Sequence, residues 1–164
     1  MLSLVLLIAA CAYSSNRKEI DRSTVKNVNL KDFMGKWYEI ARFDHRFERG
    51  MTDITATYTL LDNGKIKVVN RGMRNGKPTE AIGKAKTTDI PGQLRVSFFW
   101  EFYSDYNILA MGKSGEWALI GSNSPKYLWI LSRTPHLSSS TLEYIIRLAQ
   151  ARGYDTDKLI IDND

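Results

Sequence analysis

Gly35-Lys-Trp-Tyr-Glu-Ile-Ala-Arg-Phe43 is the first of a series of short segments, rich in aliphatic and aromatic residues, that are separated by turn-forming residues. The second, Ile54-Thr-Ala-Thr-Tyr-Thr-Leu-Leu61, runs into Asp62-Asn63-Gly64, which is typical of a hairpin turn because Asn-Gly accepts positive φ. The series continues at residues 65–70, 80–87, 93–100, 106–112, 116–122 and 126–133. Eight short strands at this spacing predict an all-β antiparallel sandwich or barrel rather than a parallel α/β sheet.

A single amphipathic helix is expected near the C-terminus. The serines at 138–140 offer N-caps, and Gly153 is a suitable C-terminal stop. The apolar residues between them have helical spacing: Leu142, Ile145, Ile146 and Ala149. After an all-β run, such a helix is expected to pack its apolar face on the outside of the sheet, and a short strand is expected at 158–161.

The composition is that of one globular domain. Of the 164 residues, 43% are hydrophobic and 25% charged, with eight Tyr, six Phe and four Trp, which suits a β-rich fold with a large apolar interior. The formal net charge is +5, but Lys and Arg are spread among Asp and Glu. We therefore expect a mixed solvated surface with a mild preference for anionic membranes, and no nucleic-acid partner.

The N-terminal residues are typical of an export signal. Residues 1–10 form an apolar run that ends in small residues and is far too short to cross a bilayer, which takes about 20 apolar residues as a helix. Ile8-Ala9-Ala10-Cys11 resembles the lipobox of bacterial lipoproteins. This resemblance implies cleavage before Cys11, acylation of that residue and a stable membrane anchor. Ala12, where an Asp would imply retention at the inner membrane, implies the outer membrane.

One feature departs from this pattern, because no Lys or Arg precedes Arg17. Either the chain starts upstream or the signal is weak, and the alternative is the frayed apolar N-terminus of a soluble protein. Cys11 is the only cysteine, so the chain forms no internal disulfide and its fold depends on the core alone.

Three further motifs resemble the signatures of the lipocalin family. Gly35-Lys36-Trp37-Tyr38 resembles the first, glycine-x-tryptophan at the start of the first strand, and residues 126–135 resemble the third, with Arg133 near the end of the last barrel strand. Ser104-Asp105-Tyr106 resembles the middle signature, with serine in place of threonine. Residues 37–50 are similar to the bacterial outer-membrane lipocalins, to which apolipoprotein D and plant temperature-induced lipocalins are related. The resemblance covers nearly all of the chain after about residue 29.

This resemblance implies an eight-stranded antiparallel up-and-down barrel with the helix outside. It divides the chain into a signal peptide at 1–10, the lipidated Cys11 with a tether through residue 28, and the barrel domain at 29–164. A cation–π contact between Trp37 and Arg133 is implied at the closed end. Gly35 is expected to let the backbone turn into the first strand. The signature residues expected to close the barrel are Gly35, Trp37, Asp105, Tyr106 and Arg133.

Strand alternation and the register of the family predict the lining. The residues expected to point inward and bind the ligand are Ala56, Tyr58, Leu60, Ile66, Val68, Leu94, Val96, Phe98, Tyr127, Trp129 and Leu131. Such an apolar and aromatic wall suits an acyl chain, since each buried methylene contributes about 0.8 kcal/mol. The alternative is a filled core without a cavity. The role of Arg42, Arg46 and Arg49 is also open, because they could bind a phosphate or carboxylate headgroup or form a solvated face.

The sequence favours a binding protein over an enzyme. His45 and His136 lie far apart without ligand-spaced partners, so we expect no metal and no cofactor. Asp105 and Glu39 have no partner base or nucleophile. The expected function is to carry or store a fatty acid or lysophospholipid for the cell envelope, at the periplasmic face of the outer membrane. The alternatives are a tetrapyrrole-binding lipocalin, with His45 as the axial residue, and a lipoprotein that binds a protein partner. The sequence does not decide whether the chain forms a homodimer.

Overall fold

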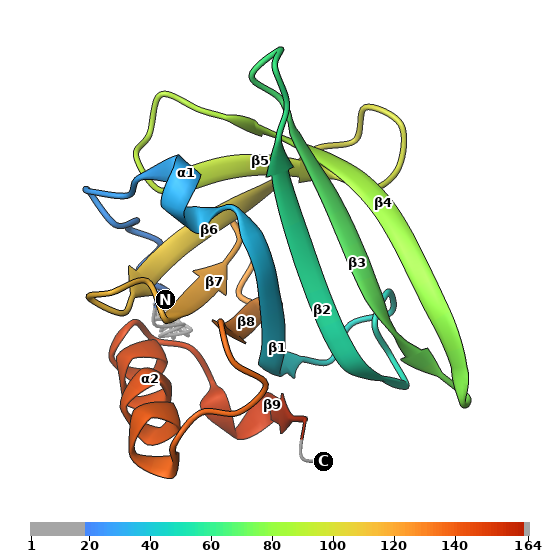
Figure 1. Ribbon diagram of the computed structural model, residues 1–164. Helices are drawn as coiled ribbons and strands as arrows, with labels where there is room; N and C mark the ends of the chain where they lie inside the picture. Colours follow the sequence, from blue (N-terminus) through green and yellow to red (C-terminus); the bar gives the residue numbers. More distant parts are fainter. Residues whose placement is uncertain (1–18, 163–164) are drawn as a thin grey trace, which may run out of the picture.

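One antiparallel sheet closes on itself to form the body of the molecule (Figure 1). The computed structural model describes residues 19–162, and within that range the sheet has nine strands. They are β1 (Gly35–Phe43), β2 (Met51–Leu60), β3 (Ile66–Arg74), β4 (Lys77–Thr87), β5 (Gln93–Ser97), β6 (Ser104–Met111), β7 (Trp117–Gly121), β8 (Leu128–Ser132) and β9 (Leu159–Ile161). The helical elements are α1 (Leu30–Phe33), α2 (Ser139–Ala151) and the short η1 (Thr156–Lys158). The predicted signal peptide and Cys11 lie outside the described residues.

Closure depends on β1, which pairs with three strands. Residues 35–38 pair with β2 along one edge, while residues 38–42 pair with β8 along the other. Where β2 has diverged, β9 takes over the first edge by pairing with residues 41–43. The strands β1 to β8 therefore form a closed eight-stranded antiparallel barrel in sequence order, which confirms the predicted fold, and β9 is an addition to it.

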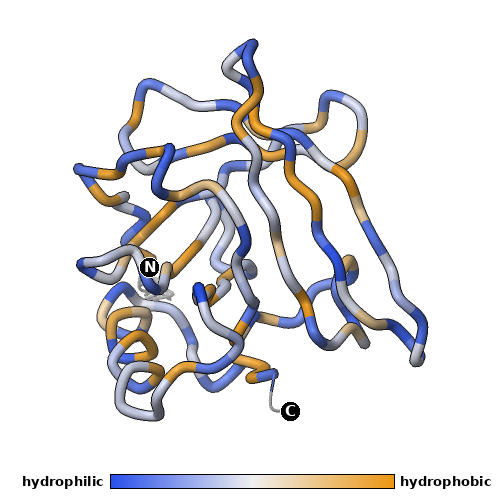
Figure 2. Tube along the Cα trace, viewed as in Figure 1, coloured by the Kyte–Doolittle hydropathy of each residue, from blue (hydrophilic) through white to orange (hydrophobic). Residues whose placement is uncertain are grey.

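The barrel has two apolar cores, one on each side of its wall. The outer core lies beneath α2, where Ile145 and Ala149 are fully buried against wall residues such as Leu119 and Ile130. The helix begins at the N-cap Ser138, whose hydroxyl accepts from the N–H of Thr141. Figure 2 shows hydrophobic and hydrophilic residues alternating along the strands and around the turns of α2. The prediction that the helix packs outside the sheet is confirmed.

A bulge in β1 changes which side chains face inward. Glu39 pairs with Leu131, but the next pair is Ala41 with Ile130, so Ile40 is an additional residue in the strand. Ile40 and Ala41 both face the outer core, as Phe43 does after them. Arg42, which simple alternation from Trp37 places outside, points into the barrel opposite Trp129.

The closed end is built around the indole of Trp37, which is fully buried. The guanidinium of Arg133 lies over this ring with its Cζ atom 3.7 Å from the centroid. It also donates to the carbonyl oxygens of Lys36, at 2.9 Å, and Asp32, at 2.6 Å. Gly35, at φ +91°, turns the chain from α1 into β1 in a conformation that glycine adopts without strain. The Trp37–Arg133 contact that the resemblance implied is therefore present.

The segment before α1 packs on the barrel instead of forming a tether. Ile20 is buried in the outer core, and the N–H of Asp21 donates to the carbonyl of Arg152 at 2.8 Å. The N–H of Val25 donates to Ile108 at 2.9 Å, which joins the segment to β6. The expectation of a tether through residue 28 was therefore wrong for residues 20–25, because apolar residues at 20 and 25 find places on the wall.

Replacing Arg133 by lysine tests the closed end. An ammonium group keeps the charge but loses the planar fork, so we expect a loss of about 1–3 kcal/mol in the free energy of unfolding. The matched control is Arg147→Lys on α2, whose ion pair with Glu143 is exposed and long at 3.8 Å, and which we expect to cost less than about 0.5 kcal/mol. Urea unfolding measures both. Equal losses would contradict the role of Arg133.

Candidate functional site

The predicted lining residues gather on the inner face of the barrel. Five of them are buried in the inner core: Tyr58, Ile66, Val68, Leu94 and Leu131. Three are half-buried and pack against that core: Ala56, Val96 and Trp129. The family register therefore placed these eight side chains on the correct face of their strands.

The other three predicted residues lie at the two ends of the lining. Leu60 pairs with Ile66 near the closed end, where it is 37% exposed. At the open end Tyr127 stacks on Trp129, with ring centroids 5.8 Å apart and an interplanar angle of 13°. Phe98 lies against β4 at Gly83, where a Cβ atom would stand 2.7 Å from its ring. A glycine at 83 is therefore needed for Phe98 to fit.

Part of the inner wall remains accessible to solvent. Ala56, Asn70 and Ala81 lie in one row, since Ala56 pairs with Asn70 and Asn70 with Ala81. They face inward, yet Ala56 and Asn70 are half-buried and Ala81 is exposed. An inward-facing side chain that solvent reaches must border an open space. Among the described residues, the Oδ1 atom of Asn70 is buried without a hydrogen-bond partner, which gives this wall a polar atom.

Two other hollows lie elsewhere on the surface. One of about 360 Å³ lies at the β3–β4 hairpin, and one of about 340 Å³ lies between β1, β2 and the C-terminal segment. Neither is lined by any of the eleven predicted ligand residues. The barrel interior remains the better candidate, because only there do apolar walls converge from every strand.

The lower interior is closed by aromatic rings and one hydroxyl pair. Tyr58 donates to Tyr106 between their hydroxyl oxygens at 2.9 Å, and the ring of Phe33 packs edge-on against Tyr58 at 5.3 Å. Burial raises the pKa of both tyrosines well above the ordinary value, so both stay protonated. Tyr106 therefore belongs to the floor. Its signature neighbour Asp105 does not, because it faces outward and pairs with Arg95 at 3.4 Å.

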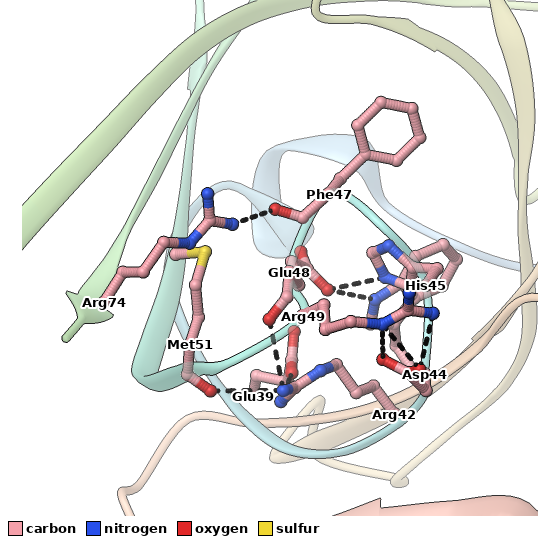
Figure 3. Close-up of polar contacts among 10 residues, drawn as sticks. Glu39, Arg42, Asp44, His45, Phe47, Glu48, Arg49, Met51 and Arg74 are labelled. Atoms are coloured by element: carbon pink, nitrogen blue, oxygen red, sulfur yellow. Dashed lines mark hydrogen bonds and ion pairs between the residues drawn. The ribbon is translucent and has the colours of Figure 1, made fainter.

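The upper interior is polar, and Arg42 organises it (Figure 3). This side chain is buried and donates to Oε1 of Glu39 at 3.0 Å. It also donates to the carbonyl oxygens of Glu48, at 3.3 Å, and Met51, at 3.1 Å. Arg42 thus fixes the loop at 44–50 across the mouth, while its Nε atom is buried without a hydrogen-bond partner among the described residues.

Glu48 enters the barrel from this loop and meets two partners. Its Oε2 atom lies 2.7 Å from Nε2 of His45 (Figure 3). The same atom accepts from the indole N–H of Trp129 at 3.1 Å. Burial raises the pKa of Glu48, but His45, Trp129 and Arg42 outweigh that effect and lower it below the ordinary value. Burial raises the pKa of Glu39 well above the ordinary value, and Glu48 adds to the rise while Arg42 opposes it. The mouth therefore contains Glu48, whose ionised form is favoured, and Glu39, whose protonated form is favoured.

The remaining charged candidates differ in their availability. Arg49 forms an exposed ion pair with Asp44 at 2.7 Å, and Arg46 lies over the ring of Phe47 at 4.7 Å. Arg42 is committed to internal partners, so the rim cations are Arg46 and Arg49. His45 is buried and engaged by Glu48 through Nε2, which argues against an axial role toward a tetrapyrrole. Among residues 19–162, no three His, Cys, Asp or Glu side chains gather as metal ligands, and His136 is exposed in the segment that follows β8.

Sequence reasoning missed several interior residues. Glu39, Arg42 and Glu48 were not placed in the lining. Alternation from Trp37 could have found Glu39, whereas the bulge at Ile40, which turns Arg42 inward, and the path of the loop that carries Glu48 have no clear sequence signal. The small residues Ala81 and Gly83 were missed as well, although alternation along β4 could have found them. The inner core also contains Phe33, Ala85, Ile108, Ala118 and Ile120.

The floor, the apolar wall and the accessible mouth define a calyx, a closed up-and-down barrel that opens at one end to receive a small ligand. The model of the lipocalin-like domain matches residues 28–164, and this chain belongs to the lipocalin family. Lipocalins are in general binding proteins without enzymatic activity, which agrees with the prediction of a non-enzyme.

Relatives extend over most of the chain. Outer membrane lipoprotein Blc of Escherichia coli (strain K12) is 40% identical over 158 residues, which cover 94% of this chain and 88% of that protein. Temperature-induced lipocalin-1 of Arabidopsis thaliana is 36% identical, over 88% of this chain and 83% of that protein. Insecticyanin from the tobacco hornworm Manduca sexta has a similar fold, with a TM-score of 0.71 and 22% identity over 89% of this chain and 86% of that chain.

The two carboxyl groups predict opposite dependences of stability on pH. The raised pKa of Glu39 means that the folded state holds this proton more tightly than the unfolded state, so its contribution falls as pH rises from about 4.3. The lowered pKa of Glu48 gives a contribution that is present above about 4.3 and is lost as pH falls. We expect Glu39→Gln to flatten the decline at higher pH and Glu48→Gln to flatten the decline at lower pH. Urea unfolding across pH 4–8 measures this, and curves parallel to the parent's would contradict it.

Proposed function

We propose that this lipocalin binds a monoacyl lipid, a fatty acid or a lysophospholipid, with the acyl chain inside the barrel and the headgroup at the mouth. The observation that carries the proposal is the row formed by Ala56, Asn70 and Ala81, which faces inward and is still reached by solvent. An acyl chain in that space gains about 0.8 kcal/mol for each methylene it buries.

The walls around this row have the chemistry that an acyl chain requires. Val96, Phe98 and Trp129 supply apolar surface on the strands that complete the circle, and the buried inner core closes the space from below. The exposed alanine on an inner face supports an accessible interior over a filled core without a cavity, the alternative left open by the sequence.

The headgroup end is defined by the rim cations. Arg46 and Arg49 lie on the loop at the mouth, and both are exposed. A lipid phosphate or carboxylate at the opening would gain charge-assisted hydrogen bonds there. Arg42 is less suited to this role than Arg46 and Arg49, because its guanidinium is buried and already donates to Glu39 and two backbone carbonyls.

Anchoring at the outer membrane through an acylated Cys11 is part of the same proposal. Its support is the lipobox-like sequence before Cys11 and the relation to proteins that are named outer membrane lipoproteins in Escherichia coli and Citrobacter freundii. We place the barrel on the periplasmic face, where it would carry or store lipid for the envelope. In the part of the chain from 19 to 162, no helix has the length and apolarity to cross a membrane.

Ligand titration tests the proposal. The full chain carrying Cys11→Ser is delipidated and titrated with oleate and with lysophosphatidylcholine, and quenching of the Trp129 emission is followed, with Trp129→Phe as the spectroscopic control. We expect saturable binding of one lipid per chain at micromolar concentration. A folded barrel that takes up neither lipid would overturn the proposal and favour a protein partner as the ligand.

Two adjacent residues of β4 provide a matched pair of variants. Ala81→Phe adds a ring to the inner hollow, whereas Ile82→Phe adds one to the outer face, where Ile82 is 57% exposed. We expect Ala81→Phe to weaken binding by about tenfold or more, because the added volume takes the place of two or more methylenes of the ligand. Ile82→Phe should bind like the parent. Equal affinities of the two variants would show that the ligand lies elsewhere.

A further inference from the structure

Asn70 is a polar side chain on a part of the inner wall where strand structure does not favour it. It lies in the middle of β3, where the strand is paired on both edges, and asparagine is among the residues that are depleted in strands. Its side chain faces inward, in one row with Ala56 and Ala81. Departures from local preference occur mainly at functional positions, so the surroundings of Asn70 indicate what it binds.

Within residues 19–162, the wall supplies no partner for the buried end of this amide. Both cross-strand neighbours are alanines, which have no polar side-chain atom. Among the diagonal neighbours, the hydroxyl of Tyr58 donates to Tyr106 at 2.9 Å, and the hydroxyl of Thr79 forms no bond to Oδ1 of Asn70. This Oδ1 atom is therefore a buried acceptor without a donor among the described residues, which costs free energy in the ligand-free protein.

The residues on either side of the row leave a space beside the amide. On the mouth side, Gly72 is covered, because a Cβ atom there would stand 2.8 Å from Cε of Met51. On the floor side, Gly83 is covered in the same way by the ring of Phe98, at 2.7 Å. The row that contains Asn70 lies between these two covered positions, and its alanine on β4 is exposed although it faces inward. A ligand that enters this space therefore lies against the amide.

The position of Asn70 along β3 separates it from the headgroup end. Arg74, at the mouth end of this strand, donates to the carbonyl oxygen of Phe47 at 2.6 Å, in the loop that carries the rim cations. Asn70 precedes Arg74 by four residues, a distance of about 14 Å along an extended strand. The next inward position toward the floor is Val68, which pairs with the buried Tyr58. With a headgroup at the rim, the amide thus meets the middle of an acyl chain.

A hydroxyl group on the acyl chain is the partner that fits this position. It is uncharged, it donates to Oδ1, and it also accepts from the amide N–H if the amide is turned over. A bare methylene leaves Oδ1 unpaired, and a charged group would be costly among the apolar residues around the row. The chemistry of Asn70 therefore favours a hydroxylated chain over an unsubstituted chain of the same length.

We propose that Asn70 makes this barrel selective for a fatty acid whose chain carries a hydroxyl group near its middle. The inference rests on the proposed binding of a monoacyl lipid and names the class of chain within it. The hydroxyl bound at Asn70 pairs the buried acceptor and fixes how far the chain enters the barrel. The glycerol of a lysophospholipid offers the same hydroxyl chemistry, but the depth of Asn70 places that group nearer the mouth.

Two ligands that differ only in the hydroxyl test the proposal. The full chain carrying Cys11→Ser is delipidated and titrated with stearate and with 12-hydroxystearate, and quenching of the Trp129 emission is followed. We expect the parent to bind the hydroxylated acid about fivefold more tightly. In Asn70→Leu, which keeps a similar shape without polar atoms, we expect the preference to be reversed, because the hydroxyl is then buried without a partner. Each variant is titrated with both acids, so general effects of the substitution on the barrel cancel.

The matched control is Thr79→Val, which removes a neighbouring inward hydroxyl and keeps the shape of the side chain. Thr79 lines the hollow at the β3–β4 hairpin, and this variant should keep the preference of the parent. Urea unfolding of the ligand-free proteins adds a readout that a structural role would not give. Asn70→Leu should unfold at the same urea concentration as the parent or at a higher one, since it removes the unpaired acceptor.

The outcomes that contradict this inference differ from those that contradict the proposed function. If neither acid binds to the folded barrel, the proposed function fails and this inference fails with it. If both acids bind and Asn70→Leu leaves their ratio as in the parent, or Thr79→Val changes it equally, binding of a monoacyl lipid stands and the role of Asn70 is overturned. An Asn70→Leu variant that loses stability and keeps the ratio would make Asn70 a structural residue.

A third pair of ligands distinguishes the two sources of the hydroxyl. It consists of 1-stearoyl lysophosphatidylcholine and its analogue without the glycerol hydroxyl. We expect Asn70→Leu to bind these two lipids in the same ratio as the parent does. A preference that depends on Asn70 in this pair, and not in the pair of acids, would assign the amide to the glycerol and overturn the hydroxylated chain.

Discussion

The pairing of β1 with β2, β8 and β9 is the constraint on which the rest of this structure depends. One strand has two edges, and β1 divides the first of them between β2 and β9 while β8 occupies the second. The bulge at Ile40 lies at this division. It turns Ile40 and Ala41 toward α2 and Arg42 toward the interior, so a single additional residue supplies both the outer core and the polar mouth.

The fold could be predicted from the sequence because its determinants are local or carried by signatures. Asn-Gly turns, alternating strands and the Trp37 and Arg133 motifs each specify short-range geometry, and the inward register of eight lining residues follows from them. The polar mouth could not be predicted in the same way. Strict alternation places Arg42 outside, and only the pairing of β1 with β8 shows where the period is interrupted. The N-terminal segment was misjudged for a related reason, because two isolated apolar residues pack on distant surfaces.

Charged groups occupy the mouth of an otherwise apolar barrel. Burying Glu39, Arg42 and Glu48 is costly unless each finds partners, and the guanidinium of Arg42 meets a carboxyl group and two carbonyl oxygens. These contacts hold the loop at 44–50 over the opening. The free-energy cost of burying the charged groups is therefore linked to the placement of the rim cations, which lie on this loop. The upper barrel is therefore organised by electrostatics, while the floor below it is organised by packing.

The outer surface of the barrel beneath α2 differs from the outer surface of β3 to β5. Under α2 the wall is covered, and its residues obey ordinary packing rules. On β3 to β5 it is uncovered, and there cross-strand like charges and strained, exposed rings occur together. Departures from local rules concentrate at functional surfaces. Phe98 connects this surface with the interior, because it packs on the inner face at Gly83 while the next residues project outward.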